Sequence, residues 1–221
     1  MTTRVLHLWQ LLSPTLPIGA FAYSDGLEAA CEAGLLGDAD DTFRWLSDLM
    51  EAQLLTVDLP FVRALYEAAA EPDEETANQL AATLLARRET RELRDSDVHL
   101  GRSLRRLLPA LQIDVDSLDW PARIPFARPF THAAAHWRVG VSDTLRGYLW
   151  IWLESQVSAA VKLVPLGQTD GQRILFELSR AAEQRLGAAF TRDAGGPGHP
   201  TVALALLSCA HETQYSRLFR S

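Results

Sequence analysis

The feature that most limits how this chain can fold is a nearly continuous apolar stretch, LRGYLWIWLESQVSAAVKLVP, which runs from Leu145 to Pro165. Its length matches a membrane span, but Glu154 lies near its middle and Lys162 near its end. Each charge in the centre of a membrane helix would cost roughly 2.5–3.5 kcal/mol on insertion scales. We therefore expect a buried central helix in a soluble helical bundle, because a large helical core requires an apolar helix of this length.

The rest of the chain predicts an all-α fold. Apolar residues recur every three to four positions, while the alternation of Val, Ile and Thr expected of strands is nowhere sustained. Prolines and glycines separate about eight to ten helices, which we expect to form a multi-helix bundle with a single domain over residues 1–221. Two stripes show the helical spacing: Phe43, Leu46, Met50 and Leu54, and Leu100, Leu104, Leu107 and Leu111.

Composition excludes several classes of function. The hydrophobic content of 48% is enough to fill a core, and the net charge of -7 argues against nucleic-acid binding, which needs a basic face. This charge also gives no indication of binding to an anionic membrane. The two cysteines, Cys31 and Cys209, are too few for a disulfide framework and suit a reducing compartment. No apolar signal-peptide core follows the first residues, so we expect a cytoplasmic protein.

The segment SPTLPIGAFAYSDGLE, Ser13–Glu28, is unusual for a helical protein. Its prolines and glycine predict an extended loop, after which Asp25 and Glu28 have the spacing of a capping box at the start of a helix. A phosphate-binding loop is excluded, because no Gly-Lys-Ser/Thr follows and no strand precedes. Later in the chain, Pro60 is expected to open a helix that Asp58 caps.

Five segments together resemble the family of the urease accessory protein UreF. They occur in the family's order along nearly the whole chain, and their combination is far more specific than any one of them. One departure is Ala20, where many members of the family have a second glycine. The five segments are SPTLPIGAFAYSDGLE, Thr56–Pro60, RRETRELR at Arg87–Arg94, VKLVPLGQ at Val161–Gln168, and HETQYSRLFRS at His211–Ser221.

This resemblance implies a function in assembling a metal centre. Proteins of the UreF type are all-helical homodimers that bind a second accessory protein, UreD (also called UreH), and the GTPase UreG. The complex acts on apo-urease, and GTP hydrolysis by UreG drives nickel into the urease active site. The resemblance implies an adaptor that positions or gates the GTPase and neither hydrolyses urea nor binds GTP. An alternative is a GTPase-activating protein that acts directly on UreG by inserting a charged side chain at the phosphate.

The C-terminal segment 212–221 is the first candidate for a partner-binding site. Tyr215, Leu218 and Phe219 would lie on one face of a helical turn, flanked by Arg217 and Arg220. Either this tail folds back onto its own core, or it binds in a pocket of a partner. The resemblance favours binding to the UreD/UreH-type partner, with the tail becoming ordered on binding.

Lys162, the single lysine of the chain, is the second candidate. Within an apolar helix its ammonium must reach the surface, pair with a carboxylate or face a partner. Glu28 and Asp58 are the candidate carboxylates, since Glu154 lies about 12 Å away along the helix. The resemblance implies that Ser24, Glu28, Asp58 and Lys162 form a polar patch that controls the GTPase.

The remaining polar clusters have simpler explanations. The charged segment Arg87–Asp97 predicts a solvated helix face with pairs between Arg88 and Glu92 and between Arg91 and Asp95, although the resemblance also allows a partner or dimer surface. His132 and His136 are spaced for a shared metal, but no third ligand is near, and Cys209 and His211 would point apart on a helix. We therefore expect no intrinsic metal or cofactor, because nickel and GTP are handled by the complex. No catalytic residues are expected, and Trp150 and Trp152 are expected in the core.

Overall fold

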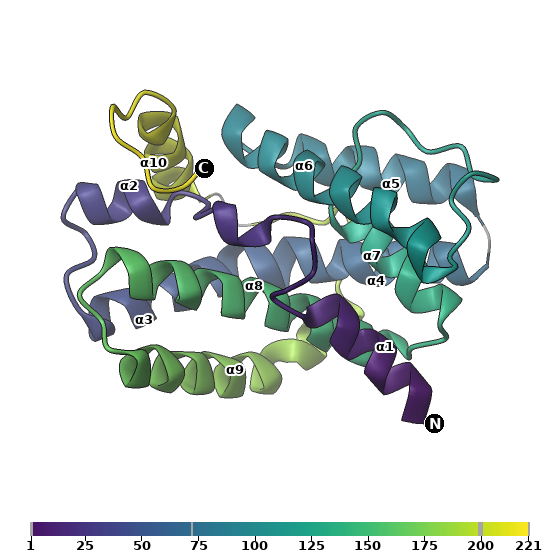
Figure 1. The fold of residues 1–221 in the computed structure, drawn as a ribbon, viewed down its shortest axis with the longest axis horizontal. Coiled ribbons are helices and arrows are strands. Elements are labelled where there is room, and N and C mark those ends of the chain that lie inside the picture. Colours follow the sequence, from purple (N-terminus) through teal and green to yellow (C-terminus); the bar gives the residue numbers. More distant parts are fainter. Residues whose placement is uncertain (1, 72, 199–200, 221) are drawn as a thin grey trace.

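The structure, a computed structural model, describes residues 2–71, 73–198 and 201–220. These residues form helices without any strand (Figure 1), which confirms the all-α prediction and the expected number of helices. The elements are α1 (Thr2–Leu12), η1 (Ala20–Ala22), α2 (Leu27–Glu32), α3 (Ala39–Leu49), η2 (Met50–Asp58), α4 (Leu59–Ala70), α5 (Glu74–Ala86), α6 (Arg91–Leu107), η3 (Leu108–Leu111), α7 (Ala127–His136), α8 (Val141–Leu163), α9 (Gln168–Thr191) and α10 (Val202–Glu212).

Helix α8 is the buried central helix that the apolar stretch predicts. It packs against α1, α2, α4 and α9 and lies in the middle of the bundle in Figure 1. One residue departs from expectation, because the Trp150 side chain is 40% exposed and does not belong to the core. None of the helices in the described ranges is long and apolar enough to cross a membrane. The core face of α8 carries Leu145, Leu149, Leu153, Val157 and Ala160.

Helices α3 and α4 form one continuous helical segment, joined by the π-helical stretch η2. Leu46, Met50 and Leu54 are completely buried on this segment, which confirms the apolar stripe predicted there. Pro60 lies in the first turn of α4, as predicted, and Asp58 occupies the position before this helix. The predicted cap is wrong, because the Asp58 side chain makes no capping hydrogen bond. The wider π-helical turns carry the helix past Pro60, whose nitrogen has no hydrogen to donate.

The irregular stretch between α6 and α7 is held tightly against α6. At Gly101, an added Cβ atom would lie 2.3 Å from the carbonyl oxygen of Ile124 and 2.8 Å from the carbonyl carbon of Pro125. The backbones of the helix and the loop therefore meet at a position where only glycine fits. This contact places the loop, and Phe126 after it, beside the buried polar residues of α6.

The C-terminal residues return to the start of the chain. Helix α10 packs against α2 and α6, and the backbone N–H of Arg220 donates a hydrogen bond to the carbonyl oxygen of Ala22 at 2.8 Å. Helix α10 ends at Glu212, and no helical turn follows in the described part of the tail. The prediction of one helical face with Tyr215, Leu218 and Phe219 is therefore wrong. Ser221 lies outside the described residues.

Candidate functional site

The C-terminal tail is anchored on one carboxylate of the bundle. The backbone N–H groups of Leu218 and Phe219 donate hydrogen bonds to the two oxygens of Glu28, at 2.6 Å and 2.8 Å. The Phe219 side chain is only 6% exposed, so it packs into the protein's own core. Tyr215 and Leu218, in contrast, are largely exposed. The tail is thus folded back through its backbone and one aromatic ring, with its other apolar side chains facing outward.

A buried histidine completes the anchor. His211 is fully buried, with Nε2 3.2 Å from Glu28 and Nδ1 2.8 Å from Glu92. His211 therefore lies between a carboxyl group of α2 and one of α6. Burial alone would raise the pKa of Glu28, but the two tail N–H groups and His211 outweigh it and hold that pKa below its usual value. Arg217 lies 3.5 Å from Glu92 and ties the tail to α6 as well.

These contacts replace the capping box expected at the start of α2. Helix α2 follows Gly26 without a side-chain cap, and Asp25 and Gly26 both have positive φ values, 49° and 85°. The Glu28 carboxylate binds the tail, while Asp25 accepts a hydrogen bond from Ser96 on α6 at 3.4 Å. The capping-box prediction is therefore wrong, because the left-handed turn directs the two side chains to different partners. Ser24 keeps a local role, since its Oγ accepts a hydrogen bond from the Glu28 N–H.

Lys162 reaches the surface and lies over the tail. Its Nζ is 5.5 Å from the centroid of the Phe219 ring, within the range of a cation–π contact. Among the described residues it forms no ion pair, so neither Glu28 nor Asp58 is its partner. Lys162 therefore contacts the ring of Phe219, Glu28 accepts a hydrogen bond from the Phe219 N–H, and Ser24 Oγ accepts one from the Glu28 N–H. These three of the four predicted patch residues are brought together.

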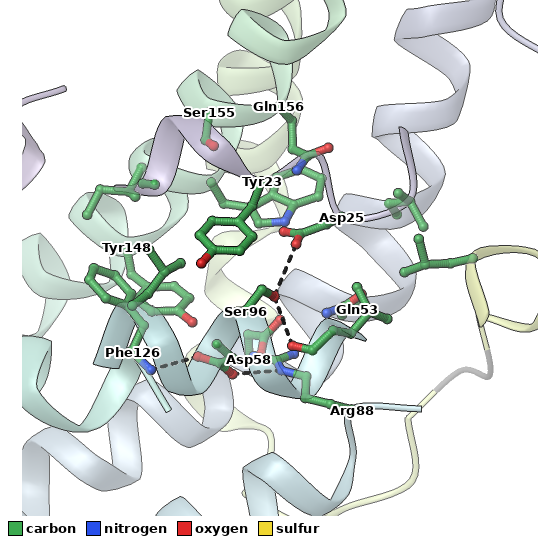
Figure 2. A pocket seen from close by; sticks show the side chains of 18 of the residues that line it. Tyr23, Asp25, Gln53, Asp58, Arg88, Ser96, Phe126, Tyr148, Ser155 and Gln156 are labelled. Atoms are coloured by element: carbon green, nitrogen blue, oxygen red, sulfur yellow. Dashed lines mark hydrogen bonds and ion pairs between the residues drawn. The ribbon is translucent and has the colours of Figure 1, made fainter. Parts of the chain in front are cut away.

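Asp58, the fourth predicted patch residue, belongs to a separate buried cluster shown in Figure 2. The Arg88 guanidinium lies between two carboxylates, with Nη2 2.7 Å from Asp58 and Nε 2.8 Å from Asp97. Asp97 also accepts a hydrogen bond from the Phe126 N–H at 2.6 Å. Burial raises the pKa of Asp58, although Arg88 opposes this effect. The cluster connects η2, α6 and the loop before α7 inside the bundle.

The segment Arg87–Asp97 is therefore only partly the solvated face that its charges predict. Arg91 pairs with Asp95 at 3.5 Å as expected, and both side chains are exposed. Arg88, however, precedes α6, which Thr90 caps, so it does not form the predicted pair with Glu92. Sequence reasoning missed the partners of Arg88 because they lie on other elements of the bundle.

The histidine pairs considered for metal binding are used differently. The Nε2 atom of His132 is 3.0 Å from the carbonyl oxygen of Asp114, and its ring packs edge-on against Trp120. Cys209 is exposed whereas His211 is buried, so the two do not face a common site. Within the described ranges, no three His, Cys, Asp or Glu side chains are grouped as a metal site would require.

The fold and the anchored tail define an all-helical protein that presents apolar side chains on an ordered C-terminal segment. Comparison with known proteins shows to which family the chain belongs. The model of the family UreF matches residues 36–179. A urease accessory protein UreF of Alcanivorax borkumensis is 43% identical, with 97% of each chain aligned. Another from Alkalilimnicola ehrlichii is 45% identical over 97% of this chain and 95% of its own, and one from an Azoarcus species is 43% identical over 98% and 95%. The chain belongs to the UreF family of urease accessory proteins, which implies a role in urease maturation.

Proposed function

We propose that this protein is a cytoplasmic adaptor for GTP-dependent nickel insertion into apo-urease. In this proposal a homodimer bridges a UreD/UreH-type protein and the UreG GTPase and regulates that GTPase. Membership of the UreF family supports a role in urease maturation, and the names of the relatives describe accessory proteins. The nickel is cargo of the complex, so the proposal requires binding surfaces on this chain and no catalytic group.

The observation that carries the proposal is the exposed apolar surface of an anchored tail. The side chains of Tyr215 and Leu218 are exposed, although the backbone N–H of Leu218 donates a hydrogen bond to Glu28 in the bundle. An aromatic side chain has few rotatable bonds, so it loses little conformational entropy on binding and is a favourable anchor for a partner pocket. We propose that the UreD/UreH-type protein binds Tyr215 and Leu218, with Arg217 and Arg220 at the rim. Phe219 supports this surface from below.

Co-expression with the UreD/UreH-type protein and the UreG-type GTPase, followed by size-exclusion chromatography, tests this proposal. Replacing Tyr215 and Leu218 together by serine should remove the partner from the complex without unfolding the chain, since both side chains are exposed. Phe176→Ser on α9 is a matched control, because Phe176 is 66% exposed and lies on a different helix. A double variant that still purifies with the full complex would refute partner binding by the tail.

The proposed regulation of the GTPase is tested separately. We propose that the exposed Lys162 faces UreG beside the tail, while the buried Ser24 and Glu28 hold the tail in place beneath it. Asp58 holds its side of the bundle in place through Arg88. Lys162→Ala should lower urease activation in an assay with all components present, with no loss of helix content. Single-turnover GTP hydrolysis by UreG, with and without this protein, separates gating from direct activation. Unchanged urease activation by a folded Lys162→Ala protein would contradict the regulatory role.

A further inference from the structure

The buried acidic cluster borders a partly open cavity that the proposed adaptor function does not use. The cavity has a volume of about 100 Å³. A single water molecule needs roughly 10–15 Å³ of such space, so the cavity is large enough for several water molecules. Tyr23, Tyr148 and Trp152 contribute aromatic walls, while Asp25 and Gln156 contribute polar groups. Figure 2 shows Gln156 and Asp25 toward one end of the lining and Asp58 and Arg88 toward the other.

Two hydrogen-bond acceptors on this lining lack full partners. Gln156 is only 2% exposed, yet its Oε1 atom accepts no hydrogen bond from any described residue. Leaving a buried acceptor unsatisfied carries a substantial penalty, so such an atom indicates a missing donor. Among the described residues, the Asp25 side chain has a single long hydrogen bond, which Ser96 donates at 3.4 Å. It is held in the left-handed conformation, φ 49°, which few residues other than glycine adopt.

The charges on the lining do not balance. Asp25, Asp58 and Asp97 place three carboxyl groups around the single guanidinium of Arg88. Arg88 pairs with Asp58 and Asp97, so Asp25 forms no ion pair of its own within the described part of the chain. We propose that this cavity binds a guanidinium group, which donates hydrogen bonds to Asp25 and Gln156 and stacks on the aromatic wall.

A guanidinium fits these groups better than other cations do. It is planar and weakly hydrated, it stacks on aromatic rings, and its several N–H donors can reach acceptors on different residues. An alkylammonium is a more strongly hydrated point charge, and its transfer into an aromatic cavity costs more. A metal ion is disfavoured because the described residues provide no group of three metal-ligating side chains. Neutral urea has the same shape as guanidinium but cannot neutralise Asp25.

Isothermal titration of the purified chain, at constant ionic strength, tests the proposal with methylguanidinium, methylammonium and urea as probes. Methylguanidinium should bind saturably, with one site per chain and with an affinity at least about tenfold higher than that of either other probe. Trp152 lines the cavity, so tryptophan fluorescence provides a second readout. The N-acetylated amide of arginine tests whether the bound guanidinium belongs to a protein side chain or to a small molecule. Binding of this longer probe would indicate the arginine side chain of a protein, and binding of methylguanidinium alone would indicate a small molecule.

Two variants connect binding to the cavity. Asp25→Asn removes the unpaired charge, and Gln156→Leu removes the unsatisfied acceptor at nearly constant volume, so each should weaken methylguanidinium binding about tenfold or more. Asp193→Asn, in an exposed loop, is the matched control and should bind as the wild type does. If one cavity variant fails to fold, the other still decides. No saturable binding to the folded wild type, equal binding of urea, or unchanged binding by both variants would overturn the proposal and leave the cavity to ordered water.

Discussion

The buried carboxyl group of Asp25 allows a quantitative prediction of how the free energy of unfolding depends on pH, independent of any ligand. Burial raises the pKa of Asp25 from 3.8 to about 6, because Arg88 only partly offsets the loss of solvent and Asp97 and Asp58 repel the ionised form. Each pKa unit corresponds to about 1.4 kcal/mol, so ionised Asp25 costs the folded state about 3 kcal/mol relative to the unfolded chain. That cost is a large part of the stability of a typical domain.

The sign of the pH dependence follows from the direction of the shift. Between pH 3.8 and about 6 the folded protein keeps a proton on Asp25 that the unfolded chain has released. The free energy of unfolding therefore falls as the pH rises through this range, as far as this one group is concerned. Below the range both states are protonated and the penalty vanishes. Above it both are ionised and the penalty is complete.

Asp25→Asn should therefore stabilise the protein in neutral solution and not in acid. Asparagine is nearly the same size, tolerates the positive φ value at this position, and can still bond to Ser96. We expect the variant to exceed the wild type by up to about 3 kcal/mol near pH 8 and to match it near pH 4. Urea unfolding at a series of pH values gives the difference directly, since acid effects of other groups are common to both proteins.

Asp193→Asn provides the control, because this carboxyl group lies in an exposed loop and its neutralisation should change the free energy of unfolding little. A difference between Asp25→Asn and the wild type that is the same near pH 4 and near pH 8 would refute the reasoning. A variant less stable than the wild type in neutral solution would refute it more strongly, because the ionised carboxylate would then be stabilising.

The remaining predictions concern packing and the tail. Gly101→Ala should destabilise the protein by more than about 3 kcal/mol in urea unfolding, because its Cβ atom would overlap the Ile124 carbonyl group. Gly187→Ala is the matched control on α9, where a Cβ atom meets nothing within 4 Å, and should stabilise by up to about 1 kcal/mol. Glu28→Gln should speed tryptic cleavage after Arg217 and lower the free energy of unfolding by roughly 1.5–3 kcal/mol, since a neutral amide replaces the carboxylate that accepts the tail N–H groups. Mass spectrometry follows the cleavage, and an unchanged rate would contradict the anchoring of the tail by Glu28. In the wild type the pKa of Glu28 is lowered, so its contribution is complete above its ordinary value of 4.5 and is lost as the pH falls through the folded value.

Much of the fold could be predicted because burial acts locally along a helix. The apolar face of α8 and the stripe with Leu46, Met50 and Leu54 need only the helical repeat to be recognised, and these side chains are buried as expected. Trp150 is the exception, because a long apolar run does not tell which side of the helix its neighbours cover. The all-α fold class and the central position of α8 were therefore predictable, while the exposure of individual side chains was not.

The polar contacts were not predictable by the same rules. Spacing rules pair a charge with residues three or four positions away, and they assigned Asp58 to a helix cap and Arg88 to Glu92. In the structure Arg88 instead joins Asp58, 30 positions before it, to Asp97 on another helix. Glu28 bonds to Leu218 and Phe219 across nearly the whole chain. A buried charge must find a partner wherever the fold supplies one, so these pairs depend on tertiary packing that no local pattern contains.

Asp25 and Glu28 show what such packing decides. The two carboxyl groups lie three positions apart in one loop-to-helix segment, and the sequence assigned them a single shared role. The fold surrounds Glu28 with the N–H groups of Leu218 and Phe219 and with His211, which lower its pKa. Asp25 has a raised pKa and, among the described residues, one long hydrogen bond. Glu28 therefore stabilises the anchored tail, while Asp25 destabilises the fold in neutral solution. A carboxyl group that is costly to ionise and faces a cavity is where a cationic ligand has the most to gain, because binding removes a penalty that the folded chain already carries.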